Sequence, residues 1–143
     1  MVMESQTLFS AENRVAPLGI ISLAGAQELS RKVEAHLVRW AKLAGLDYDT
    51  FLIESSCPRF SSGDGKGMIN STVRGYDLFF IVDVGNYSLT YNYFGQENRM
   101  SPDDHYQDLK RLIQAASGKA HRMNVVMPLL YGGRQHRRSY RES

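Results

Sequence analysis

The order of apolar segments along the chain constrains its fold more than any other feature of the sequence. An apolar run at residues 18–25 stops at Gly25, and a stripe of apolar residues with helical spacing follows it up to Gly45. A second apolar run, residues 78–84, has the composition of a central strand buried on both faces. Strands that alternate with helices predict an α/β fold with a mainly parallel sheet, flanked by helices and containing an embedded β-hairpin.

The sequence predicts seven elements in the order β-α-β-β-β-α-β, with the last strand buried. The expected strands are residues 18–25, 47–56, 68–73, 78–84 and 124–130. The expected buried stripes are Leu29, Val33, Leu37 and Trp40 in the first helix, and Leu109, Leu112, Ile113 and Ala116 in the second. Ser101 should cap the second helix with its hydroxyl, because Pro102 and the two aspartates after it favour a first turn.

Residues 85–100 connect the central strand to the second helix and contain three tyrosines and three asparagines with little periodicity. We therefore expect a long connection without regular structure, and connections of this length are usually functional or disordered. The tyrosines suggest a contact specific to this chain, such as one between subunits. A solvated loop is the alternative.

The whole chain has 143 residues, about the length of one domain, and a net charge of +2. We expect residues 1–17 to be an N-terminal extension and residues 18–143 to be the α/β domain. The charge is too small to indicate nucleic acid as a partner, and no apolar run is long enough to cross a membrane. The start of the chain does not resemble a secretory signal, so we expect a cytoplasmic protein that binds neither nucleic acid nor membrane.

Isolated cysteine and histidine residues give little indication of chemistry. Cys57 is the only cysteine, which excludes an internal disulfide and a cysteine zinc cluster. We expect a half-buried, unreactive side chain at Cys57, with a nucleophile as the alternative. The four histidines lie far apart without metal-ligand spacing, so we expect surface positions for them: His36, His105, His121 and His136.

The last segment, YGGRQHRRSYRES, follows the final expected strand and holds four arginines within eight residues. In an open parallel sheet, ligands bind beyond the carboxyl ends of the strands, where this segment begins. Two glycines allow a ligand close to the backbone, and Arg134, Arg137 and Arg138 offer forked donors that match phosphate oxygens. Gln135 could contact a base or ribose. The pattern favours a polyphosphate site, with a free basic tail and a nucleic-acid arm as alternatives.

A glycine-rich loop, residues 61–67, is the second candidate for close contact with a ligand. It lacks the spacing of a phosphate-binding P-loop, so a hairpin turn is the simpler interpretation.

Three segments, in order, resemble the amino-terminal half of ribose-phosphate pyrophosphokinases, also called phosphoribosyl pyrophosphate synthetases. Residues 59–81, RFSSGDGKGMINSTVRGYDLFFI, are similar to the family's basic residue, Phe-Ser and acidic loop, followed by Val-Arg-Gly, Asp and an apolar strand. Residues 21–33 resemble the family's first strand, glycine and helix. Residues 127–138, MPLLYGGRQHRR, resemble its later strand, Arg-Gln pair and run of basic residues.

The resemblance implies a phosphoribosyltransferase-like fold and a reaction. The family transfers the β,γ-diphosphoryl group of ATP to the anomeric hydroxyl of ribose 5-phosphate, with Mg²⁺. By position, Arg134 and Gln135 would contact ATP, while Arg137 and Arg138 would belong to the mobile catalytic loop. No residue of this chain is expected to ligate a metal.

The resemblance also implies a homo-oligomer, dimer-based and hexameric in the family. In such an assembly the neighbouring subunit supplies the loop that holds adenine, which corresponds here to Phe60, Ser62 and Asp64. Ser62 departs from the acid or amide that the family favours, and His136 and Ser139 stand where acids are frequent. These departures leave open a non-catalytic paralogue that regulates or assembles with the enzyme.

The family also has a second α/β domain, which carries the ribose-phosphate loop and further catalytic groups. The printed sequence does not extend into it, so we expect an amino-terminal portion that is inactive by itself.

Overall fold

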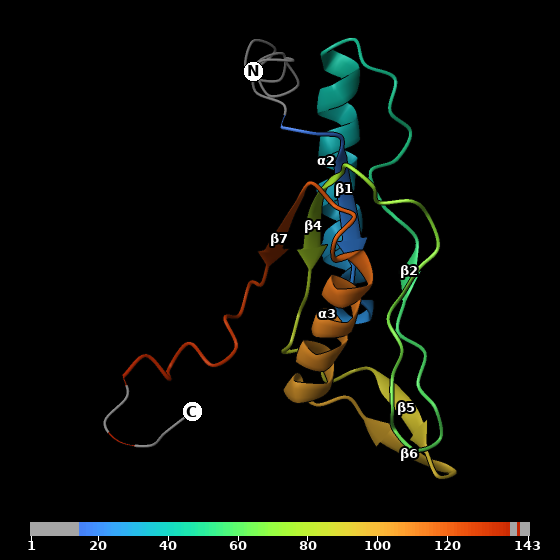
Figure 1. Cartoon of the computed structure of the whole chain (residues 1–143), viewed down its shortest axis with the longest axis vertical. Helices are drawn as coiled ribbons and strands as arrows, with labels where there is room; N and C mark the ends of the chain where they lie inside the picture. The colour runs from blue at the N-terminus through green and yellow to red at the C-terminus, as the bar shows by residue number, and fades with distance from the viewer. Residues whose placement is uncertain (1–14, 138–139, 141–143) are drawn as a thin grey trace.

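The computed structural model describes residues 15–137 and 140, and its centre is a three-stranded parallel sheet (Figure 1). The strands are β1 (Leu18–Ser22), β4 (Asp77–Ile81) and β7 (Arg122–Val126), in the spatial order β1-β4-β7. Leu18 pairs with Asp77, and Asp77 pairs with Arg122, so the three strands start in register. The mainly parallel sheet and the central position of the expected strand 78–84 are confirmed.

Two helices cover opposite faces of this sheet. Helix α2 (Gln27–Leu43) follows β1 through a short 3₁₀ turn, η1 (Ala24–Ala26), and helix α3 (Pro102–Ala116) precedes β7. Neighbouring residues of each strand point to opposite faces. Ile20 packs in the apolar cluster that contains Ala41 of α2, and Ile21 packs in the cluster that contains Leu109 of α3. The α/β architecture, phosphoribosyltransferase-like in its helix-flanked parallel sheet, is therefore confirmed.

The buried stripe of α2 differs in part from the expected one. Val33 and Leu37 pack against the core, but Leu29 and Trp40 are each 38% exposed. Ser30 and Ala41 are buried in their place, each displaced by one position. Neighbouring positions lie about 100° apart around a helix, and Val33 and Leu37 keep their places, so the buried face is displaced only in part.

Helix α3 begins as the sequence predicts. The Ser101 hydroxyl accepts a hydrogen bond from the Asp104 backbone N–H at 3.2 Å, and the Asp104 carboxylate accepts one from the Ser101 N–H at 2.8 Å. This reciprocal capping satisfies two N–H groups that the helix itself leaves unpaired. Leu109, Leu112 and Ala116 are buried, and Ile113 packs against them, so the predicted stripe is correct.

The last strand was predicted wrongly in two respects. It spans Arg122–Val126, not residues 124–130, and it lies at an edge of the sheet. Met123, Val125 and Val126 are 39%, 45% and 41% exposed, because β7 has a neighbouring strand on one side only. Apolar composition predicted a strand correctly but could not distinguish an edge from a centre.

The strands expected at 47–56 and 68–73 are much shorter than predicted. Only β2 (Ser55–Ser56) and β3 (Met68–Ile69) pair, as an antiparallel hairpin. Leu52 makes an isolated parallel bridge to Ile20, so this segment lies beside β1 without forming a full strand. The expected embedded hairpin is therefore present, with short strands.

The connection at residues 85–100 is not irregular. It contains an antiparallel hairpin of β5 (Thr90–Tyr93) and β6 (Gln96–Arg99), which lies beyond one end of the central sheet (Figure 1). The expectation of an unstructured connection was wrong. Nearly every residue of the hairpin is exposed, so no apolar alternation marks its strands in the sequence.

The burial of His105 and of Cys57 can be compared with the expectations for these two residues. His105 is 1% exposed, not a surface residue, and its Nε2 lies 2.7 Å from the Asn86 carbonyl oxygen. Cys57 is half-buried as expected, and burial raises the pKa of its thiol to about 12. Within residues 15–137 and 140, no helix is long and apolar enough to cross a membrane.

Candidate functional site

The segment between β2 and β3 folds into a tight turn that presents Phe60 to solvent. The Phe60 N–H donates to the Asp64 carbonyl at 2.8 Å, and the Gly63 N–H donates to the Phe60 carbonyl at 2.9 Å. Arg59 and Gly65 form an antiparallel bridge, so the glycine-rich loop contains the hairpin-like turn expected from sequence. We call residues 60–64 the Phe60 turn.

All three residues that the sequence assigns to adenine lie on the Phe60 turn, and all are exposed. Phe60 is 57% exposed. The Ser62 hydroxyl donates to the Asp64 carboxylate at 2.9 Å, so these two side chains are already paired. The structure thus brings the three predicted residues together on one surface turn.

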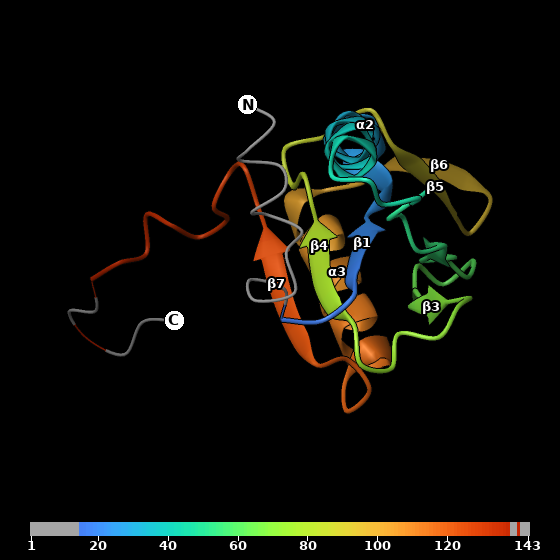
Figure 2. The same cartoon turned by 90° about the horizontal axis from the view of Figure 1, so that it is seen from above.

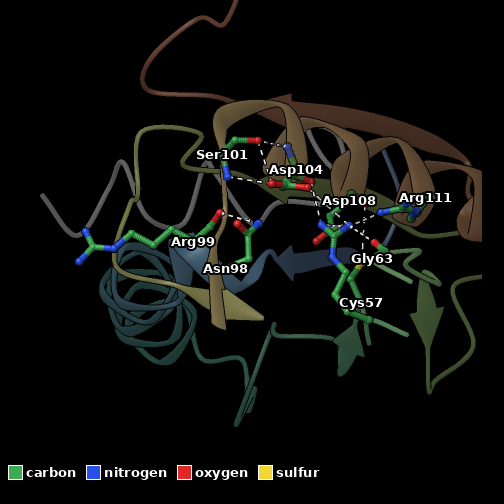
Figure 3. Close-up of polar contacts among 9 residues, drawn as sticks. Cys57, Gly63, Asn98, Arg99, Ser101, Asp104, Asp108 and Arg111 are labelled. Atoms are coloured by element: carbon green, nitrogen blue, oxygen red, sulfur yellow. Dashed lines mark hydrogen bonds and ion pairs between the residues drawn. The ribbon is translucent and has the colours of Figure 1, made fainter. Parts of the chain in front are cut away.

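Arg59 anchors the Phe60 turn to helix α3. Its side chain is only 8% exposed, and its Nη2 lies 3.0 Å from the Asp108 carboxylate. The same guanidinium donates to the Gly63 carbonyl at 3.1 Å and to the Asp104 carbonyl at 3.3 Å. Arg111 lies 2.7 Å from the same Asp108 oxygen (Figure 3). Sequence analysis assigned no such role to Asp108, because burial of a helical carboxylate depends on partners distant in the chain.

The β5–β6 hairpin supports the Phe60 turn from a second direction. The Phe94 N–H donates to the Ser61 carbonyl at 2.9 Å. A Cβ atom at Gly63 would lie 3.2 Å from the Tyr93 ring, so glycine allows that ring to pack closely on the turn. The Tyr91 ring lies under the Arg59 guanidinium, with 5.1 Å between Cζ and the ring centroid. Strand β5 and the hairpin tip thus belong to the structure that holds the turn.

The second candidate segment follows β7, and its described part is residues 131–137, which we call the arginine loop. Arg134, Gln135 and Arg137 are all exposed there, while Arg138 and Ser139 lie outside the described residues. The Gln135 N–H donates to the Gly132 carbonyl at 2.8 Å, and Gly132 has a φ of 73°, which glycine adopts without strain. The loop therefore presents its polar side chains from a defined turn.

Tyr131 attaches the arginine loop to the first turn of α3. Its hydroxyl donates to the Asp103 carboxylate at 2.7 Å, and its ring lies 5.6 Å from the Tyr106 ring, centroid to centroid. The hydrogen bond to a negative acceptor favours the neutral phenol and raises the pKa of Tyr131. No pattern in the sequence indicated this contact. Helix α3 thus contacts both candidate segments through its first two turns.

The two candidate segments lie on opposite sides of the molecule. Both views show the chain beyond β7 extending away from one side of the sheet, while β2, β3 and the β5–β6 hairpin lie on the other (Figures 1 and 2). The structure therefore gathers Phe60, Ser62 and Asp64, and separately Arg134, Gln135 and Arg137. It does not bring the two groups together within one chain.

A comparison with protein-family models matches residues 18–143 to the N-terminal domain of ribose phosphate pyrophosphokinase. The chain belongs to this family. A comparison with curated proteins found no match. The matched residues include the sheet, both helices and both candidate segments, so the similarity extends well beyond the three stretches of sequence that first indicated it.

Proposed function

We propose that residues 18–143 form the ATP side of a ribose-phosphate pyrophosphokinase. The complete reaction would transfer the β,γ-diphosphoryl group of ATP to the anomeric hydroxyl of ribose 5-phosphate, releasing AMP. The observation that carries this proposal is the arginine loop. Three donor-rich side chains, Arg134, Gln135 and Arg137, are exposed in the segment that follows the carboxyl end of the parallel strand β7.

The chemistry of diphosphoryl transfer explains the arginines. Negative charge spreads over the phosphate oxygens as the group moves, and fixed guanidinium groups stabilise that charge. Arginine keeps its charge at all relevant pH values and can bind two oxygens at once. We assign ATP contacts to Arg134 and Gln135, and transition-state contacts to Arg137 and, beyond the described residues, to Arg138.

The adenine would be held by Phe60, Ser62 and Asp64 of a second copy of the chain. The Phe60 turn and the arginine loop of one chain lie on opposite sides, so one chain does not present both to the same nucleotide (Figures 1 and 2). A homo-oligomer built from dimers would join the turn of one copy to the loop of another. Phe60 would stack on the base, and the Ser62–Asp64 pair would contact its polar edge.

Magnesium is not assigned to any residue of this domain. No group of three His, Cys, Asp or Glu side chains suited to a metal occurs in the described part of the chain. The Mg²⁺ of the family reaction would enter with the phosphates of ATP.

A non-catalytic paralogue is the second candidate, and one observation favours it. Ser62 stands where the family favours an acid or amide, and its hydroxyl donates to the Asp64 carboxylate at 2.9 Å, so one expected base-contacting side chain is altered. Such a protein would assemble with a catalytic relative through the same surfaces. Full-length protein that oligomerises, binds ATP and yet forms no AMP with ribose 5-phosphate would support this second function.

Arg134→Ala in the intact protein tests the first proposal. We expect the KM for ATP to rise about tenfold or more, the cost of one lost hydrogen bond to a charged group, and turnover to fall. Arg39→Ala, an exposed arginine on α2, is the matched control and should change neither value. AMP formation is the measurement. Wild-type turnover and KM in Arg134→Ala would remove that residue from the site.

A further inference from the structure

The tip of the β5–β6 hairpin has an unusual construction. Phe94 has a φ of +46° and Gly95 a φ of +83°, so both central residues of the tip are left-handed. Two-residue hairpin turns of this kind favour Asn-Gly or Gly-Gly. A bulky side chain in the left-handed region costs roughly 1–2 kcal/mol. Strain of this kind concentrates at functional positions.

Contacts of the Phe94 side chain within the chain offset little of this conformational cost. It is 69% exposed, the Tyr93 ring beside it is 45% exposed, and the two rings meet edge to face at 4.9 Å between centroids. The turn itself is held by other groups, because the Gly95 N–H donates to the Asn92 side chain at 2.8 Å. The hairpin therefore does not need the Phe94 ring to close.

The tip is fixed to the Phe60 turn, as the Phe94–Ser61 hydrogen bond and the packing of Tyr93 on Gly63 show. Phe60 is 57% exposed. Phe60, Tyr93 and Phe94 thus belong to two adjoining segments, and all three expose apolar rings. We call these three residues the aromatic tip. Anything that approaches the Phe60 turn must also approach the β5–β6 hairpin.

We propose that the aromatic tip is a contact surface for a second copy of this chain, and that Phe94 is its main anchor. This inference rests on the proposed function, in which the Phe60 turn reaches the arginine loop of another copy. The partner surface has suitable chemistry, because Arg134 and Arg137 are exposed and guanidinium groups pack on aromatic faces. The hairpin already forms such a contact internally, between Arg59 and Tyr91.

Two substitutions remove the Phe94 ring without harming the turn. Asn and Gly both tolerate the left-handed conformation, so Phe94→Asn and Phe94→Gly should retain the hairpin. Leu43→Asn is the matched control, since Leu43 is 41% exposed and is the last residue of α2. The C-terminal end of α2 lies at the end of the molecule away from the β5–β6 hairpin (Figure 1). Sedimentation velocity over a range of concentrations, with and without ATP, measures the self-association of the full-length protein.

We expect wild-type protein to self-associate and both Phe94 variants to raise the dissociation constant at least tenfold, while Leu43→Asn matches wild type. Wild-type protein that stays monomeric under all conditions would overturn the inference. Wild-type affinity in the Phe94 variants, or an equal loss in the control, would do the same. Hydrogen exchange of the wild type provides a test without a variant. Residues 91–97 should become protected upon association, and unchanged exchange there would contradict the proposal.

The two proposals fail separately. Association that depends on Phe94 in a protein that neither binds ATP nor forms AMP would defeat the pyrophosphokinase function alone. Turnover with association insensitive to Phe94 would defeat the contact surface alone.

Discussion

Arg59 and Asp108 form a buried ion pair, with 3.0 Å between Nη2 and the carboxylate and only 8% of each side chain exposed. Arg111 lies 2.7 Å from the same carboxylate, so two positive groups share one buried negative charge. Asp104 adds a more distant carboxylate, 3.8 Å from Arg59. The Arg59 Nε atom is buried without a partner within the described residues. This pair sets the position of the Phe60 turn on helix α3.

Arg59→Ala should destabilise the fold strongly. Removal of one partner of a buried ion pair leaves an uncompensated charge and costs about 3–5 kcal/mol. Arg111 would still neutralise Asp108 in part, so we expect the lower end of this range. Urea unfolding measures the change. Arg99→Ala is the control, because its side chain points away from this network (Figure 3). Equal stability of the two variants would contradict a role for Arg59 as the anchor.

Gly63→Ala should reduce stability and disturb the Phe60 turn. Gly63 has a φ of +87°, which costs an alanine roughly 1–2 kcal/mol. The new methyl group would also press on the Tyr93 ring at 3.2 Å. We therefore expect a loss above the backbone cost alone, measured by thermal or urea unfolding.

Gly45→Ala separates the cost of the left-handed backbone from the cost of the contact with Tyr93. Gly45 has a φ of +76° and nothing within 4 Å of an added Cβ, so it reports the backbone cost only. The difference between the two variants in their loss of unfolding free energy measures the contact with Tyr93. Tyr93→Ala should abolish that difference. Identical losses at both glycines would show that the hairpin does not press on the turn.

Local signals in the sequence predicted the parts of the fold that depend on local structure. The cap at Ser101 was predicted because its partner Asp104 lies within the same turn. The central strand was predicted because residues 78–84 are apolar on both faces, as a strand between two helices requires. The arginine loop was placed correctly after the last strand, although that strand itself was displaced.

The missed features depend on pairings between distant segments. The edge position of β7 is a property of the sheet, which no pattern within Arg122–Val126 encodes. The β5–β6 hairpin carries polar residues on both faces, so its sequence shows no alternation of apolar and polar residues. Only the glycine at its tip indicates a turn. Burial of Arg59 requires two carboxylates from another element. Position within the family indicated candidate ATP contacts, which stay a prediction, while the groups that hold the Phe60 turn appear only in three dimensions.

Tyr131 should control the order of the arginine loop. Its hydroxyl donates to Asp103 at 2.7 Å, and this bond raises the pKa of the phenol. Tyr131→Phe removes the bond and keeps the ring contact with Tyr106. We expect faster hydrogen exchange in residues 131–135 with the exchange of α3 unchanged. Tyr48→Phe serves as the control, because this tyrosine packs against the apolar cluster on the α2 face of the sheet. Unchanged exchange in the loop would show that Asp103 does not hold it.

The same hydrogen bond predicts how the stability of the fold changes with pH. A raised pKa means that the folded state favours the neutral phenol. The stabilisation of the fold by this hydrogen bond is therefore complete below the unfolded pKa of about 10. It is lost as pH rises through the higher folded pKa. Asp103→Asn should lower the pKa of Tyr131 toward that of an ordinary tyrosine, which an NMR titration of the labelled ring can follow. An unaltered titration would indicate that Asp103 is not the cause.

Asp77 should make the sheet sensitive to acid. Arg122 donates to its carboxylate at 2.8 and 2.5 Å, and Asn124 donates at 2.8 Å, so three hydrogen bonds join β4 to β7. The Arg122 hydrogen bonds, with a further contribution from Asn124, lower the pKa of Asp77. A lowered pKa stabilises the fold above the unfolded value of about 4, and this contribution is lost as pH falls through the folded value.

Asp77→Asn tests this dependence, because asparagine keeps the shape of the side chain and cannot ionise. We expect the variant to be less stable than wild type at pH 7 and the difference to shrink as the pH falls below about 4. Urea unfolding between pH 7 and pH 2.5 measures both curves. Asp49→Asn, at an exposed position outside the sheet, should leave the wild-type pH dependence intact. A constant difference between Asp77→Asn and wild type at every pH would assign the loss to packing, because only the ionised carboxylate can account for a difference that disappears in acid.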